Sequence, residues 1–290
     1  MMDSTNTKLT MNSLLADPLV AASLKRDGYV TVPFLTPEAL EKAREIYFNF
    51  HPNHQIPHLL NGIHMTSWCS DFTYKMDVAR SLRSISQPAS DRILKGHRSL
   101  NHVFIIKVQG DHTTFPVHQD WNVVDETKYT SVNIWVPLWD VDENSGALWI
   151  LKGSHNINRH IRGAGCLFPN YYGIKDYLKE KATSINVKAG TAVIFYHNTI
   201  HGSPPNTDKH PRVVIAFSAI PEKAPLHIYF QKNENSPLEV HHPDDDFMYR
   251  YDNLREETQF RGPTEKAAET RPSYHEKKLT IEELEALLVK

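Results

Sequence analysis

The chain is organised around one stretch, Phe115-Pro116-Val117-His118-Gln119-Asp120-Trp121. Side chains alternate between the two faces of an extended segment, so His118 and Asp120 are expected to point to the same side. One imidazole and one carboxylate would then face the same point in space. They are two of the three ligands of the two-histidine, one-carboxylate centre that binds non-heme Fe(II). The pair is weak evidence by itself, because any strand can carry a surface His and Asp. The rest of the chain has to supply the third ligand.

The overall composition is that of an ordinary globular protein. Hydrophobic residues make up 40% of the 290 residues, charged residues 23%, and the formal charge is −2. Neither basic nor acidic residues are in excess, so we expect no nucleic-acid or membrane partner. The sequence has no run of about 18 apolar residues and no apolar signal core in residues 1–10, which favours a cytoplasmic protein. Cys69 and Cys166 form no C-x-x-C pair, so neither a disulfide framework nor a zinc ribbon is indicated.

Helices are predicted before the middle of the chain and at its end. Apolar residues recur near helical spacing over residues 9–25, and Asp27-Gly28 ends the pattern. Thr36 and Pro37 begin a second helix that runs to about residue 50, and a short helix is expected around residues 77–84. Residues 51–70 have little periodicity and form either a plain connection or a loop over a site. A capping-box pattern predicts a terminal helix from Thr280.

The middle of the chain is predicted to be all β. We expect strands at residues 29–34, 103–108, 129–138, 147–151, 184–187, 191–196, 212–220 and 226–231. Many short strands separated by Gly and Pro turns are typical of a sandwich, jelly roll or barrel. Beyond about residue 236 the composition shifts to charged and turn residues. We therefore predict a β domain with N-terminal helices over residues 1–235 and a C-terminal extension over residues 236–290.

The missing parts of a metal site follow the predicted strand at residues 191–196. His201 leaves that strand and enters a Gly/Pro turn, where its ring can face the mouth of a cavity. Arg212 begins an apolar strand, where an arginine is hard to bury unless it meets an anion. Its rigid fork of donors suits a carboxylate. With the H-x-D pair, these residues are the four parts needed to bind an iron ion and a dicarboxylic keto acid.

The order of these motifs resembles the phytanoyl-CoA dioxygenase family, Fe(II)- and 2-oxoglutarate-dependent oxygenases built on a double-stranded β-helix. The likeness covers residues 15–225 or so and rests on Asp27-Gly28-Tyr29, Phe115-Pro116-Val117-His118-Gln119-Asp120, Trp135-Val136-Pro137-Leu138-Trp139-Asp140, Asn144-Ser145-Gly146-Ala147-Leu148-Trp149, Gly153-Ser154-His155, His201-Gly202-Ser203, Asn206 and Arg212. It implies a mainly β, jelly-roll or cupin-like fold, with Fe(II) as the metal and 2-oxoglutarate and O2 as cosubstrates. Lys152 stands where the family usually has a proline, outside the ligand set.

The resemblance also assigns roles to individual residues. His118, Asp120 and His201 correspond to the iron ligands, and Arg212 with Ser203 to the pair that grips the distal carboxylate of 2-oxoglutarate. Weaker assignments place three more side chains in the same pocket: Asn101, Asn133 and Trp135.

Three of the assigned residues also have a purely structural explanation. Ser203 precedes two prolines and fits an ordinary turn. Trp135 fits a core position, and Arg212 could belong to a structural ion pair. The sequence alone does not choose between the structural and the functional explanation of these residues.

The reaction that the resemblance implies is hydroxylation of a small organic substrate of amino-acid, lipid or secondary-metabolite type, with release of succinate and CO2. The same cofactors also serve desaturation, epimerisation or cyclisation, which the ligand residues do not distinguish. Asp120 favours oxygenation over chlorination, because halogenating relatives carry a small residue at that position. The motifs also fit a non-catalytic β-barrel binding or sensor protein, or a cupin-like metalloprotein that needs no keto acid. Residues 51–70, residues 163–177 and the C-terminal extension are the expected lid elements, and the oligomeric state stays open.

Overall fold

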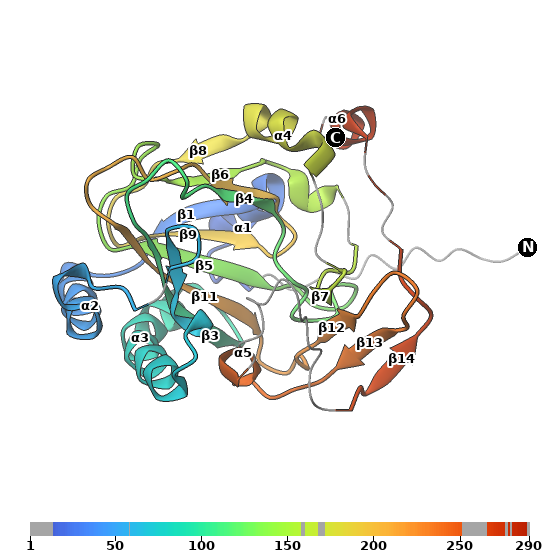
Figure 1. Ribbon diagram of the computed structural model, residues 1–290, viewed down its shortest axis with the longest axis horizontal. Helices are drawn as coiled ribbons and strands as arrows, with labels where there is room; N and C mark the ends of the chain where they lie inside the picture. Colours follow the sequence, from blue (N-terminus) through green and yellow to red (C-terminus); the bar gives the residue numbers. More distant parts are fainter. Residues whose placement is uncertain are drawn as a thin grey trace, which may run out of the picture.

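The structure is a computed structural model that describes residues 14–57, 59–157, 160–167, 172–250, 266–275, 278 and 280–288. Two sheets form its centre (Figure 1). The major sheet has the order β1 (Tyr29–Pro33), β9 (Thr191–Tyr196), β5 (Val132–Pro137), β11 (Arg212–Pro221), β3 (His97–Lys107), β2 (Ile63–Met65). The minor sheet has the order β4 (Phe115–His118), β10 (His201–Ser203), β6 (Leu148–Ile150), β8 (Thr183–Ile185). All neighbours in these two sheets are antiparallel, and the predicted jelly-roll fold is confirmed.

The two sheets bury a shared apolar layer between them. Residues of the major sheet such as Trp135, Phe195 and Val214 pack with Leu148 and Ile150 of the minor sheet. Every second residue of β5 and β9 faces this layer, because strand side chains alternate. The site described below lies at the polar end of the same interface.

Three helices cover the outer face of the major sheet: α1 (Pro18–Asp27), α2 (Pro37–Phe50) and α3 (Phe72–Ile93). In Figure 1, α3 lies beside β3, and α2 lies next to α3. Helix α1 begins at Pro18 because the Asp17 side chain accepts the N–H groups of Leu19 and Val20. It ends at Gly28, whose φ of 84° is left-handed. The prediction of a helix already over residues 14–17 is therefore wrong, while residues 9–13 lie outside the described part.

Helix α3 is much longer than the short helix expected around residues 77–84. It spans 22 residues, begins where Asp71 accepts the N–H of Tyr74, and continues through Pro88. The many polar residues of this segment make the helix hard to predict. Its apolar residues nevertheless recur at helical spacing and are buried against the sheet: Val78, Leu82, Ile85 and Ala89. Tertiary packing of this one face outweighs the low local propensity.

A third sheet joins the insert after β6 to the C-terminal extension. Its order is β14 (Glu269–Arg271), β13 (Leu238–His241), β12 (Ile228–Gln231) and β7 (Ala164–Gly165). The hairpin of β12 and β13 crosses the proposed boundary at residue 235/236, and the division into a domain and an extension stays a prediction. Gly163 must be a glycine, because a Cβ there would lie 2.2 Å from the carbonyl oxygen of Tyr229.

The remaining α-helices of the described residues are α4 (Lys175–Lys181), α5 (Phe247–Arg250) and α6 (Ile281–Leu288). Helix α6 confirms the predicted terminal helix, and Leu284 packs under the minor sheet against Leu151 and Ile200. The expectation that residues 51–70 lack regular structure is wrong for β2, which pairs with β3. Among the described residues, no helix is both long and apolar enough to cross a membrane.

Candidate active site

Two histidines face each other across neighbouring strands of the minor sheet. His118 is the last residue of β4 and His201 the first residue of β10, and the two are direct partners in the antiparallel register. Their ring centroids lie 4.2 Å apart. The sequence placed His201 in a turn; in the structure it begins a short strand that pairs with both β4 and β6. Both rings are buried, 6% and 7% exposed for the two residues.

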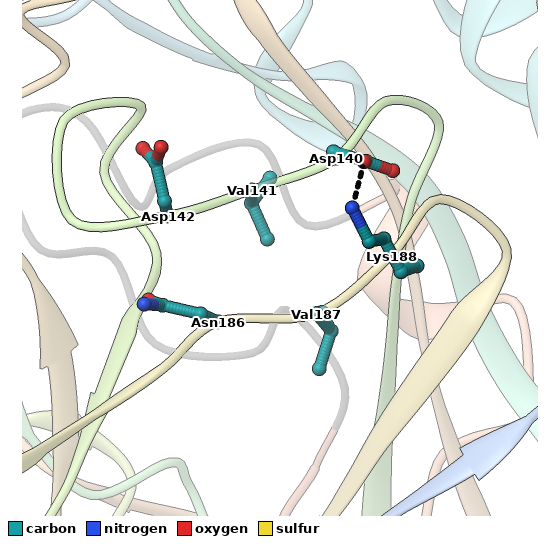
Figure 2. Close-up of a pocket in the computed structure, with 6 residues that line it drawn as sticks. All are labelled: Asp140, Val141, Asp142, Asn186, Val187 and Lys188. Atoms are coloured by element: carbon teal, nitrogen blue, oxygen red, sulfur yellow. Dashed lines mark hydrogen bonds and ion pairs between the residues drawn. The ribbon is translucent and has the colours of Figure 1, made fainter.

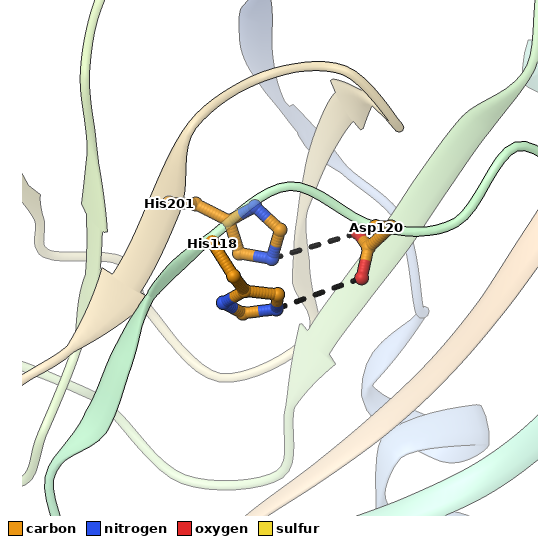
Figure 3. A group of neighbouring side chains, drawn as sticks. All are labelled: His118, Asp120 and His201. Carbon is orange, nitrogen blue, oxygen red and sulfur yellow. Dashed lines mark ion pairs between the residues drawn. The ribbon is translucent and has the colours of Figure 1, made fainter. Parts of the chain in front are cut away.

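Asp120 completes the group from just beyond the end of β4. Its Oδ1 lies 3.6 Å from His118 Nε2, and its Oδ2 lies 3.5 Å from His201 Nε2 (Figure 3). One ligand atom from each residue falls within 4.8 Å of the other two. The three predicted iron ligands are therefore brought together, although the carboxylate comes from the loop that follows the strand.

The two imidazoles present lone pairs to the same point. Each Nδ1 lies 2.9 Å from the main-chain oxygen two residues earlier, Pro116 for His118 and Thr199 for His201. A carbonyl oxygen only accepts, so Nδ1 carries the proton and Nε2 is the bare nitrogen in each neutral ring. The local backbone thus sets the tautomer of both rings.

The charge states of the group suit a divalent cation. Burial, with a contribution from His118, lowers the pKa of His201 to about 4, so this ring is neutral at physiological pH. Burial would raise the pKa of Asp120, but the two neighbouring histidines outweigh it and hold the pKa below its ordinary value. Two neutral nitrogens and one carboxylate on one face are the donor set of a non-heme Fe(II) centre with open positions. The residues fit the metal.

Arg212 is buried with an unused donor. It is 5% exposed, donates from one terminal nitrogen to the Gly146 carbonyl, and lies over the Trp135 ring at 5.4 Å. Its Nε has no hydrogen-bond partner among the described residues. Burial lowers its pKa to about 9, which still leaves it charged at neutral pH. A buried, charged guanidinium with a free N–H is suited to an anionic ligand.

A second buried basic side chain, which the sequence analysis did not single out, lies beside Arg212. Lys107 is its direct partner in the register of β3 and β11 and is 0% exposed. Its Nζ lies 2.5 Å from Ser203 Oγ and 2.5 Å from the Pro204 carbonyl oxygen. Burial, then the neighbouring guanidinium, lowers the pKa of Lys107 to about 6. The signal was available, because a lysine in an apolar strand raises the same question as Arg212.

Asn133 and Trp135 lie two residues apart on β5 and therefore on the same face of the strand. Asn133 Nδ2 donates to Asp120 Oδ2 at 2.5 Å, so Asn133 contacts a predicted metal ligand. Its own Oδ1 accepts the hydroxyl of Ser218 at 2.7 Å, and His197 Nε2 lies 3.0 Å from the same hydroxyl. Trp135 belongs to the apolar layer and also supports Arg212. The core position of the tryptophan is therefore confirmed, and its place in the cosubstrate pocket stays a prediction.

Asn101 is not brought together with these residues. It has a left-handed φ of 53° at an irregularity of β3 and lines a small pocket with α3 and α5 residues such as Arg80 and Tyr249. A further pocket, lined by Asp140, Val141, Asp142, Asn186, Val187 and Lys188, is drawn in Figure 2. Neither pocket is lined by the His-Asp-His group or by Arg212. The role of Asn101 stays a prediction.

The fold and the site together define a class: a jelly-roll protein with a two-histidine, one-carboxylate centre beside buried cations, as in the Fe(II)- and 2-oxoglutarate-dependent oxygenases. Residues 24–214 match the family model "Phytanoyl-CoA dioxygenase (PhyH)". The match covers more than half of the chain, and the chain belongs to this family. The predicted family is confirmed.

Individual relatives are more distant. "Phytanoyl-CoA dioxygenase domain-containing protein 1" of Danio rerio is 31% identical over 125 residues, which cover 41% of this chain and 43% of that protein. The match therefore spans less than half the length of that relative. Among solved structures, the non-heme α-ketoglutarate-dependent carbocyclase SnoK is similar with a TM-score of 0.53 and 15% identity, covering 72% of this chain and 86% of SnoK. EctD from S. alaskensis is similar with a TM-score of 0.51 and 16% identity, covering 72% of this chain and 78% of EctD. These structures show the fold.

Proposed function

We propose that this chain is an Fe(II)- and 2-oxoglutarate-dependent oxygenase that hydroxylates a small organic molecule and releases succinate and CO2. The observation that carries the proposal is the placement of two buried basic side chains, Arg212 and Lys107, beside the His-Asp-His group. Ser203 lies two residues after His201 on β10, which is roughly 7 Å along a strand. That spacing suits a five-carbon diacid whose keto-acid end meets the metal.

Three residues would bind the distal carboxylate. Arg212 offers its free Nε–H, Lys107 offers an ammonium group, and Ser203 offers a hydroxyl. Neither cation has an acidic partner among the ion pairs of the described residues, which argues against a structural ion pair for Arg212. The distal carboxylate of a bound dicarboxylate would balance the positive charge of Arg212 and Lys107.

His118, Asp120 and His201 would hold the iron on one face. When bound, iron supplies the oxidation of a substrate C–H bond, coupled to oxidative decarboxylation of 2-oxoglutarate. The protein residues contribute fixed neutral nitrogens, a charged carboxylate and a buried wall in which Phe195 lies 4.6 Å from the His201 ring.

The reaction type and the substrate belong to the proposal as well. The relative SnoK is called a carbocyclase and EctD is described with 5-hydroxyectoine, and at 15% and 16% identity neither chooses the outcome for this chain. We place the enzyme in the cytoplasm on sequence grounds, with a small-molecule substrate and no nucleic-acid partner.

The test is succinate release by the purified chain with Fe(II), with and without 2-oxoglutarate, across a panel of amino acids, lipids and secondary metabolites. We expect 2-oxoglutarate-dependent succinate that a true substrate stimulates, and product analysis then separates hydroxylation from desaturation, epimerisation or cyclisation. Binding of Fe(II) and 2-oxoglutarate with no succinate under any condition would favour a binding or sensor protein. Metal binding without 2-oxoglutarate binding would favour a cupin-like metalloprotein.

A further inference from the structure

Arg162 is the largest fully buried side chain of the described residues, with 0% exposure. Burying a guanidinium is unfavourable unless all of its donors are satisfied. Its Nε donates to the Asp120 carbonyl at 2.6 Å and its NH1 to the His160 carbonyl at 2.9 Å. Its NH2 meets Glu126 Oε1 at 2.5 Å in a buried ion pair. One of the three contacts therefore ends on the main chain of a predicted metal ligand.

Asp120 needs such a contact because it lies outside the sheet. Strand β4 ends at His118, so no strand pairing fixes the Asp120 peptide groups. The Asp120 N–H donates to the His197 carbonyl at 2.9 Å, and its carboxylate accepts from Asn133. The carbonyl is held by Arg162. Each polar group of Asp120 is therefore held by a residue distant in sequence.

Residues 160–165, which carry Arg162, are fastened to the third sheet on their other side. The Ile161 N–H donates to the Tyr274 hydroxyl at 3.2 Å. Tyr274 belongs to the C-terminal extension and forms two hydrogen bonds with Gln231 of β12, at 2.8 and 3.0 Å. Strand β7 pairs with β12, and the missing Cβ of Gly163 permits that approach. A continuous set of contacts thus joins Tyr274 to Asp120.

We propose that Arg162 is a positioning residue for the iron ligand Asp120, and that the C-terminal extension acts on the metal centre through it. The proposal rests on the proposed function in taking Asp120 as a metal ligand. It gives the extension a function besides that of a lid, because Tyr274 holds the segment of Arg162, and Arg162 holds the main chain of Asp120 while Asn133 holds its carboxylate. It also explains why an arginine is buried at this position, although burying an apolar side chain there would be less unfavourable in free energy.

The first test is Arg162→Met, measured by titration with Co(II), whose absorption spectrum reports ligand number and geometry. Residues that orient a metal ligand typically contribute about 10–100-fold to metal affinity, and we expect a loss in this range. We also expect an altered Co(II) spectrum, because Asp120 loses the donor to its carbonyl. Arg162→Lys keeps one cationic donor and should restore part of the affinity and the original spectrum.

The matched control is Arg98→Met. Arg98 also pairs with one carboxylate, Asp245, and donates to two carbonyls, those of Pro221 and Glu222, none of which belongs to a predicted metal ligand. Its loss should lower the melting temperature and leave the Co(II) affinity and spectrum unchanged. Equal effects of Arg162→Met and Arg98→Met on Co(II) binding would overturn the proposal.

The milder variant Tyr274→Phe tests the contribution of the extension and serves if Arg162→Met does not fold. It removes the acceptor of the Ile161 N–H, and we expect about fivefold weaker Co(II) binding, the size of one neutral hydrogen bond. Unchanged affinity and spectrum would refute the role of the extension. Other results would contradict the proposed function itself. In that case the unmodified chain would bind no Co(II), or it would bind Co(II) equally well after His118→Ala.

Discussion

The two histidines and the aspartate of the metal centre are held in different ways. His118 and His201 are direct partners in an antiparallel ladder, and the carbonyl two residues earlier fixes each tautomer. Asp120 lies beyond the strand and is fixed by Arg162, Asn133 and the His197 carbonyl. The nitrogen ligands are thus defined by local structure, whereas the carboxylate is defined by residues 13 to 77 positions away, of which the nearest is Asn133 and the farthest His197. Substitutions far from the metal should therefore act through the carboxylate.

The largest effect is expected from removing a strand-held ligand. His118→Ala or His201→Ala should lower Co(II) affinity by more than about 100-fold, beyond the range for residues that only orient a ligand. The sheet should persist, because the pairing of β4 and β10 uses backbone groups. Co(II) titration together with circular dichroism measures both quantities. The exposed His112 is the control, and full metal affinity in His118→Ala would contradict the ligand assignment.

The next largest effect is expected from Arg212, which is also held by a strand but belongs to the predicted 2-oxoglutarate site. Arg212→Leu should raise the 2-oxoglutarate concentration needed for binding by about 10–100-fold, because hydrogen bonds to charged groups contribute 1.5–3 kcal/mol. Co(II) affinity should not change. Isothermal titration of the Co(II)-loaded protein with 2-oxoglutarate measures the dissociation constant.

Arg44→Leu is the matched control for this variant. Like Arg212, Arg44 lies over a tryptophan ring, 5.3 Å from that of Trp139, and donates to a main-chain carbonyl, that of Leu138. Unlike Arg212, it also pairs with a carboxylate, Glu41. It should leave 2-oxoglutarate binding intact. An unchanged 2-oxoglutarate requirement in Arg212→Leu would remove the arginine from the cosubstrate site.

Lys107 should make 2-oxoglutarate binding depend on pH. Its pKa of about 6 leaves the free amine mostly neutral at pH 7. A bound dicarboxylate favours the ammonium form, so binding takes up a proton and the affinity should fall by up to about tenfold per pH unit as the pH rises above 6. The His201 ring stays neutral in this range, because its pKa is about 4. Titration in buffers of different ionisation enthalpy counts the proton, and Lys107→Met should abolish the uptake.

The contrast between the ligands also explains what the sequence could predict. The strands, the His118 and His201 pair and the buried Arg212 follow from local patterns: alternation, apolar runs and one charged residue in an apolar strand. Lys107 carried the same signal and was missed. The long helix α3 was missed for a different reason, since its helical character depends on burial of one face against the sheet.

No local pattern indicates Arg162 or Ser218 as neighbours of the metal centre. Arg162 lies in an irregular segment, and only the pairing of that segment with Asn122 and with β12 brings it to Asp120. Such contacts depend on how distant segments pack, which one sequence does not specify. Likewise, the irregularity of β3 at Asn101 decides which pocket that side chain lines.

The smallest expected effect is that of Ser218→Ala, which acts on Asp120 through Asn133. The only hydroxyl hydrogen of Ser218 goes to Asn133 Oδ1, so the contact with His197 Nε2 must be donated by the ring. This orients the Asn133 amide with its NH2 group toward Asp120 Oδ2. Loss of one neutral hydrogen bond should weaken Co(II) binding about fivefold. Ser86→Ala is the control, because Ser86 is also buried and contacts a histidine, His102, on the helix side of the major sheet. A larger loss of metal affinity in Ser86→Ala than in Ser218→Ala would mean that general packing, and not the orientation of the carboxylate, sets the affinity of the centre.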